Sequence, residues 1–143
     1  MLSPTDYLKL AERDYRICRK VENDLSEAYA VSGVSFHVQQ AVEKILKSLL
    51  MLHGGSPDRT RNIAKLEQTC VENGIELPEA LDGIADTLTL WESMSGYDPF
   101  VSFSEKKYLA AKQVFRELQD QVLCLLDGMK QDSGETGEQT MSM

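Results

Sequence analysis

The stretch VSFHVQQAVEKILKSLLMLH, residues 34–53, decides the fold of this chain. Its apolar residues recur at steps of three and four, which places them on one face of a helix. They are Val38, Val42, Ile45, Leu49 and Leu52, with Ala41, Leu46 and Leu50 widening the face. Because so broad a face needs neighbours on more than one side, the stretch predicts the central helix of a bundle.

The length and composition fit one globular domain with a sizeable core. The chain has 143 residues, of which 42% are apolar and 27% charged, and no apolar run approaches the roughly 20 residues of a membrane span. The first residues lack the apolar run of a secretory signal, so we expect a cytoplasmic protein with no membrane contact. The net charge of −8 argues against tight unaided binding to nucleic acid.

Apolar spacing predicts five helices in an up-and-down, all-α bundle, and no sheet. Caps and glycines set the helix ends. The predicted helices cover residue 3 to about residue 31, 34–53, about 60–73, 77–96, and a last helix after a capping box at 102–105. Ser32 and Gly33 break or bend the chain between the first two helices, and the aromatic stretch 97–103 forms a packed linker. The bundle covers residues 1–128, and the polar residues 129–143 form a disordered tail.

Neither the cysteines nor the histidines indicate a metal site or a cofactor. Cys18, Cys70 and Cys124 lie far apart, form no Cys-x-x-Cys pair and fall among apolar positions, which is typical of free thiols. His37 and His53 are not part of a Glu-x-x-His arrangement, so a carboxylate-type metal site of a helical bundle is not expected.

Three basic or mixed clusters are candidate binding sites, and each also has a structural interpretation. In the first helix, Arg13, Arg16 and Lys20 form a basic stripe that is either a solvated face or a site for a phosphate or an acidic partner. In the central helix, Glu43, Lys44 and Lys47 form either a structural ion pair with surface charge or a patch that meets a ligand or partner. Arg61, near Arg59 and Lys65, lies at a helix start that favours anions, or in a solvated loop.

Residues 36–50, FHVQQAVEKILKSLL, resemble the F-x-x-Q-Q-A-x-E-K-x-L-K-A-L-L helix of the HEPN domain family. The loop at Gly54-Gly55, the short helix after it, and Tyr97 and Pro99, where relatives often have Arg-Tyr-Pro, extend the resemblance over residues 5 to about 127. It implies a helical bundle that forms a homodimer. It also implies a partner, a small nucleotidyltransferase in a two-component, toxin-antitoxin-like pair, or the binding of a nucleotide or RNA.

Catalytic members of that family are metal-independent ribonucleases with an arginine and a histidine separated by four to six residues. The resemblance implies that the histidine transfers protons and the arginine stabilises the phosphorane charge. Before His37 the required positions 30–32 read AVS, and before His53 positions 46–48 read LKS. After Arg61, positions 66–68 read LEQ, and Gly96 replaces the arginine of Arg-Tyr-Pro. The motif is therefore absent.

We therefore expect a non-catalytic binding module with no catalytic residue. The expected binding residues are Arg13, Arg16, Lys20, Glu43, Lys44, Lys47 and Arg61. The alternative is a ribonuclease or toxin with a degenerate or relocated site, at His37 or His53 with Arg13, Arg16 or Arg61. A helical scaffold without any ligand is the third interpretation.

Overall fold

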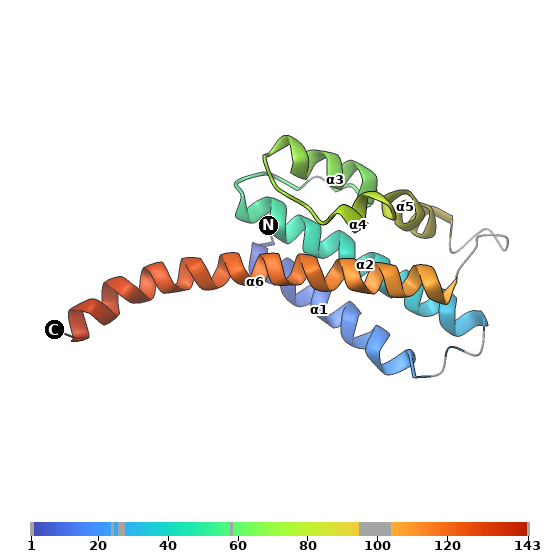
Figure 1. Cartoon of the computed structure of the whole chain (residues 1–143), viewed down its shortest axis with the longest axis horizontal. Helices are drawn as coiled ribbons and strands as arrows, with labels where there is room; N and C mark the ends of the chain where they lie inside the picture. The colour runs from blue at the N-terminus through green and yellow to red at the C-terminus, as the bar shows by residue number, and fades with distance from the viewer. Residues whose placement is uncertain (1, 24, 26–27, 58, 95–103, 143) are drawn as a thin grey trace.

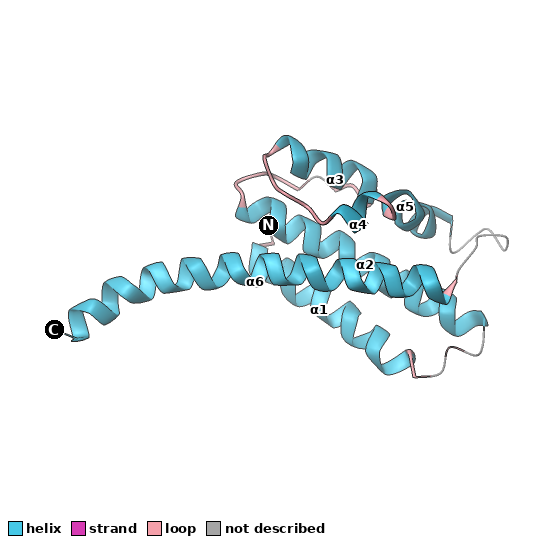
Figure 2. Ribbon diagram, viewed as in Figure 1, coloured by secondary structure: helices cyan, strands magenta, loops and turns pink. Residues whose placement is uncertain are grey.

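The computed structural model describes residues 2–23, 25, 28–57, 59–94 and 104–142, with only the backbone of 28–29, 93–94 and 131–142. Within these ranges every regular element is an α-helix (Figure 2), so the prediction of an all-α bundle is confirmed. The helices are α1 (Pro4–Val21), α2 (Ala28–Leu52), α3 (Ile63–Glu72), α4 (Glu79–Asp82), α5 (Ala85–Met94) and α6 (Glu105–Ser142). None of these helices is both long enough and apolar enough to cross a membrane.

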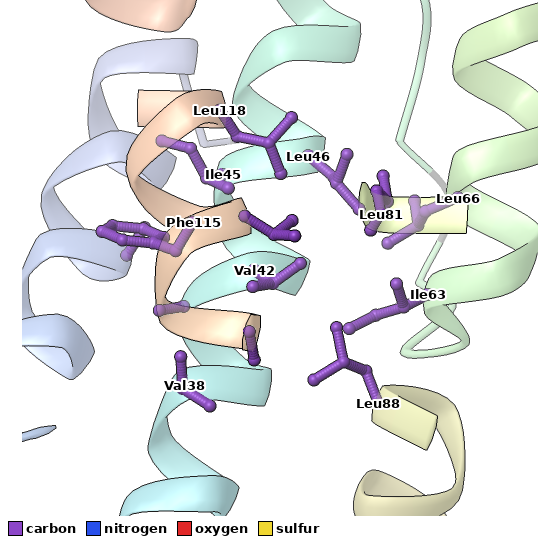
Figure 3. Close-up of a cluster of buried hydrophobic side chains, with 14 of the residues drawn as sticks. Val38, Val42, Ile45, Leu46, Ile63, Leu66, Leu81, Leu88, Phe115 and Leu118 are labelled. Atoms are coloured by element: carbon purple, nitrogen blue, oxygen red, sulfur yellow. The ribbon is translucent and has the colours of Figure 1, made fainter. Parts of the chain in front are cut away.

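Helix α2 is the centre of the bundle, as the sequence predicts. It packs against α1, α3, α5 and α6 (Figure 1). In Figure 3 its Val42 and Leu46 lie among side chains from other helices, including Leu66 of α3 and Leu118 of α6. Each of these side chains is at most 1% exposed. Since full burial of a leucine or valine stabilises the fold by about 1.5–3 kcal/mol, this contact region supplies much of the driving force for folding.

Of the break or bend predicted at Ser32 and Gly33, the break is wrong. Helix α1 ends at Val21, well before residue 30, and α2 begins at Ala28 and continues through Gly33. Ala30 and Val34 are buried and extend the apolar face of α2 by one turn. Their packing outweighs the cost of about 1 kcal/mol for a glycine inside a helix.

The predicted helix over residues 77–96 is two helices, so the described part of the chain has six helices in place of five. Helix α4 ends at Asp82 with Gly83 as its C-cap, and α5 begins at Ala85. The Ile84 N–H donates to the Leu81 carbonyl, three residues back, at 3.0 Å. This tighter turn lets Leu81 and Ile84 both enter the core.

The ends of α3 are close to the prediction. The Asn62 side chain caps the first turn by accepting from the Lys65 N–H at 3.0 Å. After α3, Gly74 has a φ of +77°, a left-handed conformation that favours glycine, so the predicted stop is confirmed.

Helix α6 starts after Ser104, whose hydroxyl accepts from the Lys107 N–H at 3.2 Å. Ser102 of the expected capping box and the linker 97–103 lie outside the described residues. Helix α6 then continues to Ser142 through the stretch for which the sequence predicts a disordered tail, and its end extends away from the other helices (Figure 1). Val122 is the last buried residue among those described. The domain boundary at residue 128 stays a prediction.

Candidate functional site

The antiparallel packing of α1 on α2 creates the polar environment of the central helix. The Ser48 hydroxyl donates to the Pro4 carbonyl at 2.8 Å, and the Cys18 thiol donates to the Val34 carbonyl at 3.5 Å. Between these two contacts, α1 runs along one edge of α2. We call this the polar edge, and it consists of His37, Gln40, Glu43, Lys44 and Lys47 of α2.

Asp14 of α1 organises the polar edge. Its side chain is 8% exposed, and its two carboxylate oxygens contact two different residues of α2. Oδ2 accepts from Lys44 Nζ at 2.5 Å, and Oδ1 lies 3.0 Å from His37 Nδ1. Asp14 is not among the binding residues that the sequence predicts. Its place between Ala11 and Cys18, at steps of three and four, is the sequence signal that could have shown its burial.

Glu43 and Lys47 form a buried ion pair on the same helix. Lys47 Nζ lies 3.3 Å from Glu43 Oε2, and the side chains are only 8% and 6% exposed. Lys47 Nζ also lies 6.0 Å from the centre of the Tyr7 ring. Burial raises the pKa of Glu43, although Lys47 and, less strongly, Arg61 and Lys44 oppose this change. The Glu43–Lys47 pair predicted from spacing alone is therefore present, and it is largely enclosed.

Two polar atoms beside this pair are buried without a hydrogen-bond partner in the described part of the chain. They are Glu43 Oε1 and Gln39 Nε2. The Gln39 carbonyl oxygen accepts from Gln40 Nε2 at 2.8 Å, so only half of its amide is satisfied. An unmade hydrogen bond in a buried position costs about 1–3 kcal/mol, which makes this the least satisfied polar region that the structure describes on α2.

Arg61 approaches the polar edge from the other side. Its side chain is 67% exposed, and its Nη1 lies 3.9 Å from Glu92 Oε1 of α5. It is close enough to Glu43 to oppose part of the rise in pKa that burial causes in that carboxyl. The structure thus brings together four of the seven predicted binding residues, which are Glu43, Lys44, Lys47 and Arg61.

The other three predicted residues, Arg13, Arg16 and Lys20, lie elsewhere. They are exposed on α1, whereas Asp14 and Cys18 are buried on its inner side. Within the described ranges none of the three forms an ion pair. They form a separate cationic face on the outside of the bundle, and both interpretations of it, solvated surface and partner site, stay open.

The two histidines cannot act together within one chain. His37 contacts Asp14, while His53 is exposed just after the end of α2, beside a cavity of about 510 Å³ that Cys124 and Leu125 also line. At 1.5 Å per residue, the helix separates the two histidines by about 24 Å. Among the described residues no group of three or more His, Cys, Asp or Glu side chains could hold a metal ion.

Comparison with known proteins identifies a family for most of the chain. The family model of the HEPN domain matches residues 5–124. No curated protein and no solved structure matches the chain significantly. The matched range contains the polar edge, Arg61 and the cationic face of α1.

Proposed function

Because this chain belongs to the HEPN domain family, we propose that it is a non-catalytic binding module that forms a homodimer and binds a protein partner. The partner class is a small nucleotidyltransferase, as in the two-component, toxin-antitoxin-like pairs that the family resemblance suggests. A net charge of −8 suits a protein partner better than bare RNA, whose phosphates repel an acidic chain.

The observation that carries the non-catalytic part is the missing arginine before both histidines. Neither His37 nor His53 follows an arginine at the spacing of the ribonuclease motif. Without that guanidinium, the charge that develops on a phosphorane has no partner at the expected place. Lys44 is not free to take the role of the missing arginine, because its ammonium is bound to the Asp14 carboxylate.

The cationic face of α1 supports the binding part of the proposal. Arg13, Arg16 and Lys20 recur at helical spacing, are exposed, and have no anionic partner within the described ranges. Complementary charges across an interface speed association and select the partner. An acidic surface of a nucleotidyltransferase would fit this face.

One observation favours a second candidate, a ribonuclease centred on His37. Asp14 Oδ1 lies 3.0 Å from His37 Nδ1, and the His37 side chain is 32% exposed. A buried carboxylate on Nδ1 orients an imidazole and leaves Nε2 for proton transfer. In this alternative Arg13, Arg16 or Arg61 would have to supply the positive charge that the phosphorane needs, although Arg13 and Arg16 lie on the exposed face of α1, outside the polar edge.

The deciding experiment is capture of the partner from the native lysate. The tagged protein is purified after nuclease treatment and its companions are identified by mass spectrometry. We expect a stoichiometric nucleotidyltransferase with the wild type, and its loss with the double variant Arg13→Glu/Arg16→Glu. The matched control is Lys106→Glu/Lys107→Glu, which reverses two exposed charges at the start of α6 and keeps the partner.

Two results would overturn the proposal. One is the absence of any stoichiometric protein companion. The other is metal-independent RNA cleavage by the purified protein that His37→Ala abolishes, which would establish the ribonuclease. Recovery of a bound nucleotide or RNA alone would show a ligand-binding module without a protein partner.

A further inference from the structure

A second polar region lies on the α6 side of α1, where a pocket of about 350 Å³ separates the two helices. Three of its lining residues come from α1 and its C-cap, and three come from α6. They are Tyr15, Arg19, Glu22, Lys112, Arg116 and Gln119. None of them belongs to the polar edge or to the set of residues proposed above for partner binding.

Part of this pocket is held rigidly. The Glu22 carboxylate accepts from Lys112 Nζ at 2.9 Å through each oxygen, and from the Tyr108 hydroxyl at 2.8 Å. Burial alone would raise the pKa of Glu22, but the contacts with Lys112 and Tyr108, together with nearby Arg19, outweigh it and lower the pKa. Glu22 is therefore a fixed anion that orders Lys112 at the wall of the pocket.

The aromatic wall is also fixed. The Tyr15 ring stacks on Phe115, with ring centres 4.5 Å apart and an interplanar angle of 28°. Phe115 is fully buried, which anchors this stack in the core. Gln119 is held by donation to Glu12 at 2.9 Å.

Two guanidinium groups of the pocket form no ion pair with a residue that the structure describes. Arg19 and Arg116 are exposed, and in the part of the chain that the structure describes neither has an acidic side chain within 4.0 Å. With Lys112 they make three cations among the lining residues, where Glu22 is the one carboxylate, and Glu12 lies beside the pocket on Gln119. This local excess of positive charge is opposite in sign to the net charge of −8 of the whole chain.

We propose that this pocket binds the phosphoryl group of a small phosphorylated molecule, with Arg19 and Arg116 as its ligands and Lys112 as the ordered third cation. A planar guanidinium matches the oxygens of a phosphate with two parallel hydrogen bonds. The volume lies at the lower end of the range for small-molecule sites, which fits a compact ligand in place of a polymer. The Tyr15 ring provides a flat surface beside the phosphate.

The test measures binding of pyrophosphate to the full chain by calorimetry, with sodium chloride at equal ionic strength as the reference. Arg19→Gln/Arg116→Gln removes both guanidiniums, and both side chains are exposed, so the fold is retained. We expect its affinity to fall about tenfold or more, since charge-assisted hydrogen bonds are lost. Arg19→Lys/Arg116→Lys keeps the charge but not the planar group, and an intermediate affinity is expected.

The control variant is Lys106→Gln/Lys107→Gln, which removes two exposed charges outside the pocket and should bind as the wild type does. The inference is overturned if the wild type gives no heat of binding. Equal binding by Arg19→Gln/Arg116→Gln and wild type would also overturn it, as would equal weakening in the control. Partner capture is tested at Arg13 and Arg16 and phosphate binding at Arg19 and Arg116, so either proposal can fail without the other.

Discussion

Asp14 and Lys44 join the first two helices through an ion pair, with Lys44 Nζ 2.5 Å from Asp14 Oδ2. Their side chains are 8% and 18% exposed, so solvent screens this pair less than a surface pair. The other carboxylate oxygen of Asp14, Oδ1, lies 3.0 Å from Nδ1 of His37, which precedes Lys44 on α2 by about two helical turns. One carboxylate thus fixes how α1 lies on α2, and with it the geometry of the polar edge.

The first prediction concerns this carboxylate. Asp14→Asn keeps the size of the side chain but removes the charge that Lys44 and His37 contact. We expect the free energy of unfolding to fall by about 1.5–3 kcal/mol, the range for hydrogen bonds to charged groups. Urea denaturation followed by circular dichroism measures the change. Asp127→Asn, at an exposed position of α6, is the control and should change stability by less than about 0.5 kcal/mol.

The buried pair of Glu43 and Lys47 gives a second prediction. Lys47→Met leaves the Glu43 carboxylate enclosed without its cation, and we expect a loss of about 3 kcal/mol. The double variant Glu43→Leu/Lys47→Met replaces both charges with apolar groups and should recover most of that loss. If Lys47→Met is as stable as the wild type, Glu43 and Lys47 do not form a buried ion pair. Urea denaturation of the three proteins decides between these outcomes.

Glu43 also predicts a dependence of stability on pH. Its pKa in the folded protein is raised above its ordinary value of 4.5, chiefly by burial. The folded state therefore holds this proton more tightly than the unfolded state does. The favourable contribution of protonated Glu43 is complete below pH 4.5 and is lost as the pH rises through the raised folded value.

The variant Glu43→Gln isolates this contribution, because it cannot ionise. We expect the stability of the wild type, relative to Glu43→Gln, to decrease as the pH rises from below 4.5 through the raised pKa. Urea denaturation of both proteins at a series of pH values measures the difference. A relative stability that instead increases with pH would show that the Lys47 contact, and not burial, dominates the titration of Glu43.

The cysteines differ in accessibility, which predicts selective labelling. Burial raises the pKa of Cys18 to about 12 and that of Cys70 to about 11, whereas Cys124 is exposed. A thiol reagent at neutral pH should therefore add once to the native chain and three times in denaturant. Intact-mass spectrometry counts the adducts. Cys124→Ser should show no rapid native labelling, and rapid modification of Cys18 would disprove the packing of α1 on α2.

The local spacing of apolar and capping residues predicts most of the helices, but it does not predict the side-chain contacts between helices. The broad apolar face around Val42 fixes α2 as the central helix, and the Glu43–Lys47 pair follows from spacing on one helix. The contact of Asp14 with α2 depends on the register between two helices, which no local pattern contains. The pocket at Arg19 and Arg116 brings together residues that are far apart in the sequence, so it is visible only in the folded chain.

The glycines show how tertiary packing overrides local propensity, and they give the last prediction. A Cβ at Gly33, inside α2, would meet no heavy atom within 4 Å among the described residues, so Gly33→Ala should stabilise the protein by about 0.5–1 kcal/mol. A Cβ at Gly55 would lie 2.4 Å from Leu50 Cδ1 and 3.2 Å from the Leu50 carbonyl oxygen. Leu50 is 1% exposed and cannot move aside freely, so Gly55→Ala should destabilise by about 1–3 kcal/mol. Thermal and urea denaturation of the two variants should therefore shift in opposite directions, and a destabilised Gly33→Ala would contradict the uninterrupted start of α2.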